Sequence, residues 1–321
     1  MQSGRRVGFG RRWYVRSLAI VSMVLVGMVL WQPACAKTLL VGADQELKAP
    51  SAAAAVAGDG DTVEIASGEY FDCAVWKANR LTIVGKGPGV IITDVSCEGK
   101  ALFVTRGSDI TIRNLTFTRA RVPDGNGAGI RAEGANLKIE GSRFINNESG
   151  ILAAESPNST ISIVGSEFDA NGKCGNACAH GVYVGHIALL RIERSKFIGT
   201  KDGHHVKSRA LRTELIGNEI EDGEKGTSSY LVDISNGGSL IMANNVLEKG
   251  PKCTNHSAAV VIGAEGVTQR TAEISIKANK FTNDQTIETI FVKNMTATEA
   301  LLVGNTFKGK VVPLSGDGSV H

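Results

Sequence analysis

The chain of 321 residues carries 35 lysines and arginines against 32 aspartates and glutamates, which gives a formal charge of +3. Five of the arginines lie within the first 16 residues, and without them the count is 30 against 32, a charge of −2. Because the rest of the chain is nearly neutral, a general electrostatic attraction to nucleic acid or to anionic membranes is excluded. Any recognition of anions must therefore be local.

The N-terminal segment has the layout of a secretory signal peptide. Its arginines precede an apolar run at residues 18–31, which is followed by the small-residue site Ala34-Cys35-Ala36. This order predicts cleavage after Ala36, and the apolar run is shorter than the roughly 20 residues that a membrane span needs. We therefore expect a signal peptide at residues 1–36 and a single mature domain at residues 37–321. The mature protein is expected to be a secreted or periplasmic monomer without a membrane anchor.

Five cysteines follow the expected cleavage site: Cys73, Cys97, Cys174, Cys178 and Cys253. Because an exported chain can form disulfides, the candidate pairs are Cys73 with Cys97, or Cys174 with Cys178. The odd count leaves one thiol over, which we expect to be Cys253. A metal site at Cys174 and Cys178 is disfavoured, because no second pair lies at metal-ligand spacing.

In chain order, the first predicted element is a short helix in the Ala-rich stretch 49–57. Beyond it, seven stretches share alternating apolar residues, a turn of Gly, Asn or Ser, and a final apolar residue: LKIEGSRF (137–144), ISIVGSEF (161–168), LRIERSKF (190–197), TELIGNEI (213–220), SLIMANNV (239–246), ISIKANKF (274–281) and LLVGNTF (301–307). Their last residues lie 24, 29, 23, 26, 35 and 26 residues apart. A repeat of this size is typical of a solenoid.

A second short strand precedes most of these stretches: GIRAE (129–133), GILAA (150–154), GVYVG (181–185), HVKSR (205–209), LVDIS (231–235) and AVVIG (259–263). Such short strands bury a core only when coils stack. The variable coil length predicts an all-β, right-handed parallel β-helix of roughly nine coils, with the N-terminal helix as a cap. A ladder of side-chain amides is expected two residues before the final apolar position, at Asn218, Asn244, Asn279 and Asn305.

The segment GDGDTVEIASGEY (58–70), with APSAAAAVA before it and NRLTIVGKG after it, resembles the opening of the pectate-lyase-like right-handed β-helix superfamily. The stretch NGAGIRAEGANLKIEGSRFINNESGIL (126–152) is similar to the coils of that superfamily. The resemblance covers nearly the whole mature chain. It implies the fold rather than an activity, because the superfamily includes lyases, hydrolases, epimerases, esterases and non-catalytic proteins.

Alternation along the strands predicts which side chains face outward. Stacked by coil, one outward column contains Arg131, Leu152, Tyr183, Lys207, Asp233 and Val261, and the next contains Glu133, Ala154, Gly185, Arg209 and Ser235. The edges of the same sheet carry His180, His186, His204 and His205. Since coils lie about 4.8 Å apart, Tyr183, Lys207 and Asp233 are expected within side-chain reach of one another.

These outward side chains suit an acidic sugar. Cations bind and neutralise a uronate carboxylate, which acidifies the adjacent C–H group, and a second residue then moves the proton. We expect Arg209 to neutralise the carboxylate, Lys207 or His205 to act as base, and Tyr183 as acid, with His204 as a further proton-transfer residue. The expected substrate contacts are Arg131, Glu133, His186 and Asp233.

Sequence signatures of enzymes with this fold match only in part. The pectate-lyase segment Arg-x-Pro-x-x-Arg is not reproduced at residues 121–125, and the aspartate pairs of polygalacturonases are missing. The Asp-Pro-His-Asp motif of mannuronan epimerases is similar at Asp202 and His204 and differs at the other two positions. No cofactor or metal site is indicated, and calcium is not supported because Asp233 is the only aspartate in the outward column.

The sequence therefore predicts an exported β-helix protein that acts on an anionic, uronate-containing polysaccharide as a metal-independent lyase or epimerase. The alternative is a non-catalytic protein that binds a glycan or assists the assembly of envelope polysaccharide. Outward Lys, Arg, Asp and Tyr are also ordinary surface residues, and opposite charges on neighbouring coils stabilise a sheet by about 0.2–1 kcal/mol per pair.

Overall fold

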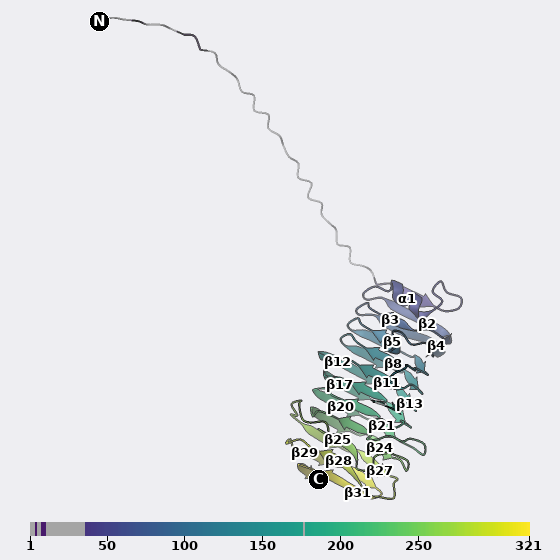
Figure 1. The fold of residues 1–321 in the computed structure, drawn as a ribbon, viewed down its shortest axis with the longest axis vertical. Helices are drawn as coiled ribbons and strands as arrows, with labels where there is room; N and C mark the ends of the chain where they lie inside the picture. Colours follow the sequence, from purple (N-terminus) through teal and green to yellow (C-terminus); the bar gives the residue numbers. More distant parts are fainter. Residues whose placement is uncertain (1–3, 5–7, 11–35, 176) are drawn as a thin grey trace. The chain divides into compact units, whose positions relative to one another are not determined.

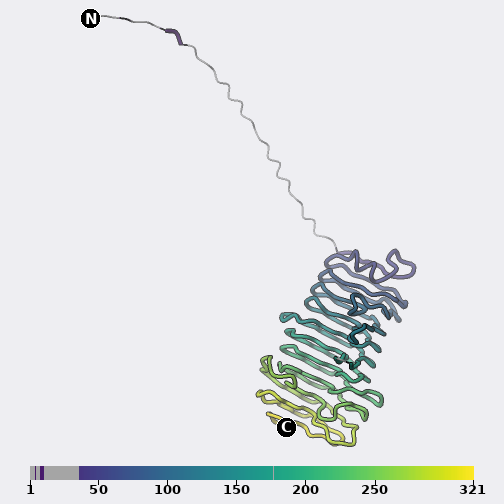
Figure 2. Tube along the Cα trace, in the orientation of Figure 1, coloured from purple at the N-terminus to yellow at the C-terminus, as the bar shows by residue number. Residues whose placement is uncertain are grey.

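The structure of the protein, a computed structural model, describes residues 4, 8–10, 36–175 and 177–321. Between Ala36 and His321 the chain forms short parallel strands that stack coil upon coil (Figures 1 and 2). The signal peptide expected at residues 1–36 lies almost wholly outside the described residues and stays a prediction. None of the described helices has the length and apolar character needed to cross a membrane.

One strand from each of ten successive coils contributes to a parallel sheet, called here the ten-stranded sheet. Its members are β3 (Ala74–Trp76), β5 (Ala101–Thr105), β8 (Ala128–Ala132), β11 (Ser149–Ala153), β16 (Val182–Val184), β19 (Val206–Ser208), β22 (Val232–Ile234), β25 (Ala258–Ile262), β28 (Thr289–Asn294) and β31 (Val311–Ser315). Each strand between β3 and β31 pairs in parallel with its equivalents in the coils before and after it. This sheet carries the outward columns that the sequence predicted.

Twenty further strands form two parallel ladders. The first ladder contains β1 (Thr38–Val41), β2 (Thr62–Tyr70), β4 (Thr82–Thr93), β6 (Ile110–Arg113), β9 (Leu137–Glu140), β12 (Ser156–Val164), β17 (Ile187–Glu193), β20 (Arg212–Ile216), β23 (Ser239–Ala243), β26 (Ile274–Lys277), β29 (Ala300–Val303) and β32 (Gly318–Val320). The second contains β7 (Thr116–Thr118), β10 (Arg143–Ile145), β13 (Glu167–Asp169), β18 (Lys196–Ile198), β21 (Glu219–Glu221), β24 (Val246–Lys249), β27 (Lys280–Asn283) and β30 (Thr306–Lys308). The ladders join at β4, which pairs with both β6 and β7.

The stack has about 11 turns, slightly more than the roughly nine predicted. The first ladder extends beyond the seven aligned repeats at both ends. Strands β1, β2, β4 and β6 precede β9, which begins at Leu137, and β32 follows β29. The predicted all-β β-helix is confirmed, and so is the cap helix, because α1 (Pro50–Val56) packs against β1, β2 and β3.

A two-residue turn connects the two ladders in coil after coil. Its first residue has a φ between 46° and 64°: Asn114, Gly141, Gly165, Arg194, Gly217, Asn244, Ala278 and Gly304. From the second coil of this series onward, the next residue is a serine or an asparagine: Ser142, Ser166, Ser195, Asn218, Asn245, Asn279 and Asn305. Each of their side-chain oxygens accepts a hydrogen bond from the equivalent backbone N–H one coil earlier, which satisfies a buried donor at every turn.

The asparagine ladder uses Asn245 where the sequence predicted Asn244. Asn218 donates its backbone N–H to Asn245 Oδ1 over 2.9 Å, and Asn245 Nδ2 donates to Asn279 Oδ1 over 2.8 Å. Asn244 instead takes the left-handed position of the turn, with φ of 56°. Asparagine tolerates that conformation better than most residues, so two adjacent asparagines divide the two roles of the turn between them.

The same shift moves the apolar end of this repeat by one residue. Leu247 pairs with Ile220 of the preceding coil and Phe281 of the next, and it is fully buried. Val246, which the repeat pattern predicted as the inward residue, is 39% exposed. The sequence pattern is compatible with either alignment here, and the pairing of neighbouring coils selects one of them.

Replacing Asn245 by Ala should lower the free energy of unfolding by about 1–3 kcal/mol, because the backbone N–H of Asn218 is left buried without its acceptor. The matched variant Asn244→Gly removes the neighbouring amide and keeps a residue that accepts positive φ, so we expect a change within about 0.5 kcal/mol. Urea unfolding of both variants measures the difference. Equal losses would contradict the ladder.

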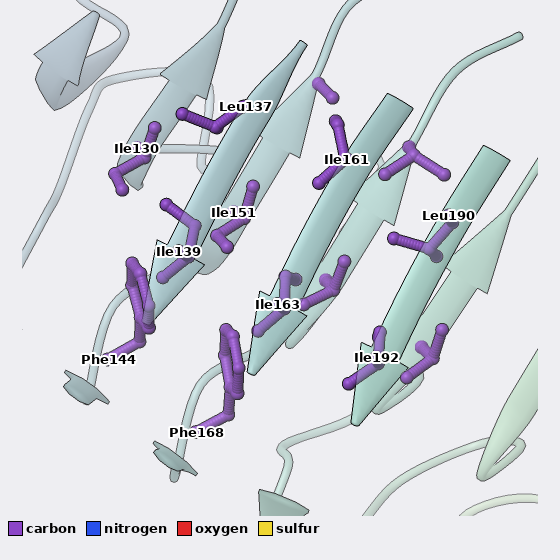
Figure 3. Packing of buried hydrophobic residues seen from close by; sticks show 14 of the residues in the cluster. Ile130, Leu137, Ile139, Phe144, Ile151, Ile161, Ile163, Phe168, Leu190 and Ile192 are labelled. Carbon is purple, nitrogen blue, oxygen red and sulfur yellow. The ribbon is translucent and has the colours of Figure 1, made fainter. Parts of the chain in front are cut away.

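Inward aromatic and aliphatic side chains fill the β-helix (Figure 3). Stacked phenylalanine rings occupy equivalent positions in successive coils: ring centroids of Phe117 and Phe144 lie 5.1 Å apart, those of Phe144 and Phe168 4.7 Å, and those of Phe168 and Phe197 4.5 Å. Parallel register puts like residues above one another, so a repeat that ends in Phe builds a continuous column.

Both candidate disulfides are present. Cys73 is bonded to Cys97 and Cys174 to Cys178, and Cys253 is a buried free thiol. The second bond closes a small antiparallel hairpin of β14 (Lys173–Cys174) and β15 (Cys178–Ala179). This hairpin immediately precedes the part of the ten-stranded sheet where the candidate site lies.

Candidate functional site

The register of the ten-stranded sheet places Tyr183, Lys207 and Asp233 on three consecutive coils. Tyr183 pairs with Lys207, and Lys207 pairs with Asp233. The column continues to Leu152 and Arg131 on one side and to Val261 on the other. The outward column therefore has the composition that alternation predicted.

Five side chains around these positions form what is called here the Lys207 cluster: Tyr183, Lys207, Arg209, Asp233 and Glu265. Lys207 Nζ donates to Asp233 Oδ2 over 2.9 Å and to Glu265 Oε1 over 2.5 Å. Arg209 donates from Nε to the Tyr183 hydroxyl oxygen over 2.8 Å and from Nη2 to Glu265 Oε2 over 2.5 Å. Two cations and two carboxylates thus neutralise one another around a phenol.

Lys207 is held as a cation in this cluster. Its side chain is 9% exposed. Burial by itself lowers the pKa of Lys207, but the charges of Asp233 and Glu265 outweigh it and raise the pKa. An ammonium group without a lone pair cannot remove a proton. The geometry therefore suits Lys207 to binding an anion and disfavours the predicted role as a base.

A column of stacked rings, called here the His column, lies at the edge of the cluster: His180, His204 and Tyr230. Ring centroids of His180 and His204 lie 4.8 Å apart, and those of His204 and Tyr230 5.3 Å. The backbone N–H of His204 donates to His180 Nδ1 over 2.9 Å, and that of Tyr230 donates to His204 Nδ1 over 3.0 Å. Because each Nδ1 accepts, the network assigns the ring proton of each neutral histidine to Nε2.

Burial keeps both histidines neutral. It lowers the pKa of His180 well below the ordinary value, with the positive charges of Lys207 and Arg209 adding to the effect. It also lowers the pKa of His204 to about 4, although the nearby Asp233 opposes the shift. His204 Nε2 lies 3.5 Å from Asp233 Oδ2, so its N–H group points toward the Lys207 cluster.

The prediction of His205 as a base is wrong for a surface reaction. His205 is fully buried, with Nδ1 2.9 Å from Thr200 Oγ1 and Nε2 3.0 Å from Asp222 Oδ1. Strand β19 begins only at Val206, after a bend in the chain, so strict alternation does not extend back to His205. Its two nitrogens are used within the fold.

Arg131 and Glu133, two of the expected substrate contacts, lie in a separate group of charges. Glu133 accepts from Lys100 Nζ over 2.6 Å and from Arg106 Nε over 3.1 Å, and Arg131 Nε lies 3.7 Å from the same carboxylate. Arg131 is two coils from Tyr183, roughly 10 Å along the stack. His186 is half-buried just beyond β16 and does not join the Lys207 cluster.

Glu265, in the Lys207 cluster, and Tyr230, in the His column, are not marked by any sequence pattern. Glu265 lies in the loop after β25, where its backbone N–H donates to Ser235 O over 2.9 Å. The alternation of side chains predicts an inward or outward orientation only within strands. It therefore does not predict the position of a loop residue that folds back over a preceding coil. Tyr230 precedes β22 in the position equivalent to His204, a pairing that becomes visible only with the register.

Among residues 36–175 and 177–321, no group of three or more His, Cys, Asp or Glu side chains is arranged to hold a metal ion. The Lys207 cluster has two carboxylates, but Lys207 lies between them and donates to both. The donor set of the cluster is thus that of an anion site.

The lowered pKa of His204 predicts a dependence of stability on pH. A histidine takes up a proton near pH 6.5 in the unfolded chain and near pH 4 in the folded one, so the unfolded state binds more protons between these values. The stabilising contribution of neutral His204 is complete above pH 6.5 and is lost as the pH falls to about 4, by roughly 3 kcal/mol.

His204→Gln removes this titration. The difference in unfolding free energy between wild type and variant should therefore shrink as the pH falls from 7 to 4, by about the same roughly 3 kcal/mol. Taking the difference between wild type and variant cancels the contributions of other titrating groups to the pH dependence. One such group is Glu248, because burial raises its pKa to about 7 and its effect on stability has the opposite sign. A difference that stays constant with pH would contradict a neutral, buried His204.

A family model described as "Right handed beta helix region" matches residues 51–180. The match assigns residues 51–180 to the right-handed type of solenoid. The protein is a parallel β-helix whose strands pair coil with coil. The fold expected from the repeats is therefore confirmed. No curated protein sequence matches the chain.

Several solved structures are similar to this chain at low identity. The A-module of the Azotobacter vinelandii mannuronan C-5 epimerase AlgE4 is 17% identical, with 85% of this chain and 94% of that chain covered and a TM-score of 0.42. The GH136 lacto-N-biosidase from Eubacterium ramulus is 12% identical, with 89% and 68% covered and a TM-score of 0.46. The pectin methylesterase from Aspergillus niger is 14% identical, with 89% and 92% covered and a TM-score of 0.41.

Proposed function

We propose that this β-helix is an exported protein that acts on an anionic, uronate-containing polysaccharide, as a metal-independent lyase or epimerase, at the Lys207 cluster. One observation carries the proposal. Lys207 and Arg209 converge on a single carboxylate, and Arg209 also donates to the hydroxyl oxygen of Tyr183. A carboxylate binder and a proton-transfer group therefore lie side by side.

The binding step falls to the two cations. Lys207 and Arg209 would hold the uronate carboxylate through charge-assisted hydrogen bonds, and Arg209 offers a planar guanidinium for it. Neutralising the carboxylate acidifies the C–H group beside it. Asp233, which is 2% exposed and accepts from Lys207 and from Ser235 Oγ, keeps the ammonium group in place.

The proton transfer falls to Tyr183. Its hydroxyl oxygen accepts the Arg209 N–H, and the guanidinium stabilises negative charge on that oxygen, so Tyr183 as a phenolate would take the proton from the C–H group beside the carboxylate. Tyr183 is also partly exposed, unlike His205. In an elimination, Tyr183 would return this proton to the departing sugar oxygen, to which the Nε2–H of neutral His204 would donate a hydrogen bond.

The second candidate function is glycan binding without turnover, as a binding or assembly protein in the envelope. The charge of Lys207 favours it, because an ammonium group that keeps its proton can bind an anion but cannot act as a base. In this case the same cluster would hold a uronate, and Tyr183 would stack against or hydrogen-bond the sugar.

The mature protein incubated with a panel of uronate polysaccharides separates these functions. Growth of absorbance from the unsaturated product detects elimination, and uptake of solvent deuterium into the sugar detects epimerisation, which leaves the absorbance unchanged. Turnover in either assay supports the enzyme. Glycan binding without either signal supports the binding protein, and absence of both binding and turnover would contradict the proposal.

A further inference from the structure

We propose that Glu265 occupies the carboxylate-binding position of the Lys207 cluster, and that a uronate carboxylate binds there by displacing it. The inference rests on the proposed function, from which it takes uronate as the ligand class. Glu265 bridges both cations, with Oε1 2.5 Å from Lys207 Nζ and Oε2 2.5 Å from Arg209 Nη2. A ligand carboxylate bound to two cations would make the same pair of contacts.

The two carboxylates of the cluster differ in exposure. The Asp233 side chain is 3% exposed and is held by Lys207 Nζ and Ser235 Oγ. The Glu265 side chain is 43% exposed. Exposed ion pairs are weak because water competes for both charges. Asp233 is therefore the fixed counterion of Lys207, whereas Glu265 is the one that a ligand can replace.

The loop around Glu265 is anchored through its backbone. The Glu265 N–H donates to Ser235 O over 2.9 Å, and Asn236 Nδ2 donates to Glu265 O over 3.3 Å. The flanking Gly263 and Gly266 have φ of 85° and 91°, which favours glycine at the two bends of the loop. Displacement then needs only rotation of the Glu265 side chain, and the loop can stay where it is.

Charge balance favours exchange over an empty site. Lys207 and Arg209 against Asp233 and Glu265 sum to zero, and a ligand carboxylate in place of Glu265 keeps that sum. Removing Glu265 without a replacement leaves one net positive charge around an ammonium group that is 9% exposed. Arg209 reaches Tyr183 through Nε rather than Nη2, so the contact to the phenol survives the exchange.

Calorimetric titration with D-galacturonate tests the exchange, with D-galactose as the uncharged probe. Glu265→Gln should bind galacturonate at least about tenfold more tightly than wild type, because the internal competitor is gone and Arg209 has lost its carboxylate partner. Galactose should show no such gain. The control Glu46→Gln removes one exposed carboxylate near β1, at the other end of the β-helix, and should behave as wild type. Glu265→Ala is the second variant, with the same expected gain.

Equal or weaker binding of galacturonate by both Glu265 variants, with unfolding midpoints like that of wild type, would overturn the inference. Glu265 would then be a permanent partner of the cations. The outcome is independent of turnover. Tighter binding without activity on any polysaccharide keeps the displacement and removes the catalytic proposal, whereas turnover by wild type without tighter binding does the reverse.

Discussion

Replacing Tyr183 by Phe should lower kcat on the uronate polysaccharide that the panel identifies by roughly 10²–10⁴-fold, the usual contribution of a positioned proton-transfer group. The variant loses only the hydroxyl that accepts from Arg209, and the ring remains between its neighbours. Lys207 and Arg209 are still present to hold the carboxylate, so KM should change little. Initial rates over a range of polysaccharide concentration measure both constants.

Tyr70→Phe makes the same chemical change away from the Lys207 cluster. Its hydroxyl donates to Ala66 O over 2.8 Å within β2, and its loss should leave turnover unchanged. A Tyr183→Phe variant with normal kcat and a raised KM would show that Tyr183 only binds the sugar. The catalytic assignment would then fail, and the glycan-binding function would gain support.

Replacing Phe168 by Ala should lower the free energy of unfolding by about 3–5 kcal/mol. Phe168 is fully buried, and its ring stacks on Phe144 at 4.7 Å and on Phe197 at 4.5 Å. Truncation removes apolar contacts in two neighbouring coils at once. The column is continuous, so collapse of one coil around the cavity is resisted by the coils on either side.

Phe307→Ala is the matched control, since Phe307 holds an equivalent position near the C-terminal end and is only partly buried. It should lose clearly less stability than Phe168→Ala in the same urea titration. Similar losses for the two variants would mean that the stacked column does not set the local stability of the coils.

The repeat carries most of the information about the fold. Alternating apolar residues and a turn of Gly, Asn or Ser are local properties of the sequence, and each coil shows the same pattern. The stacked coils and the cap helix could therefore be predicted, and the two candidate disulfides followed from the cysteines of a chain expected to be exported. The one misplaced repeat, at Asn244 and Asn245, has two equivalent residues in the turn, and only contact with the neighbouring coils distinguishes them.

The candidate site could be predicted in part. Alternation along the strands predicted that Tyr183, Lys207 and Asp233 face outward at equivalent positions of successive coils. The structure places them side by side. His205 could not be placed, because it precedes the regular strand and turns inward at a bend. Glu265 could not be found, because a loop has no period.

Taken alone, the amino-acid sequence determined the stacking of the coils and the outward column, since both follow from side-chain alternation with a period of two residues. The tertiary structure alone decided which groups carry charge and where they point. It paired Lys207 and Arg209 with Glu265, buried His205 and kept His204 neutral. The reason is that charge state depends on burial and on partners from other coils, and neither is encoded within one repeat.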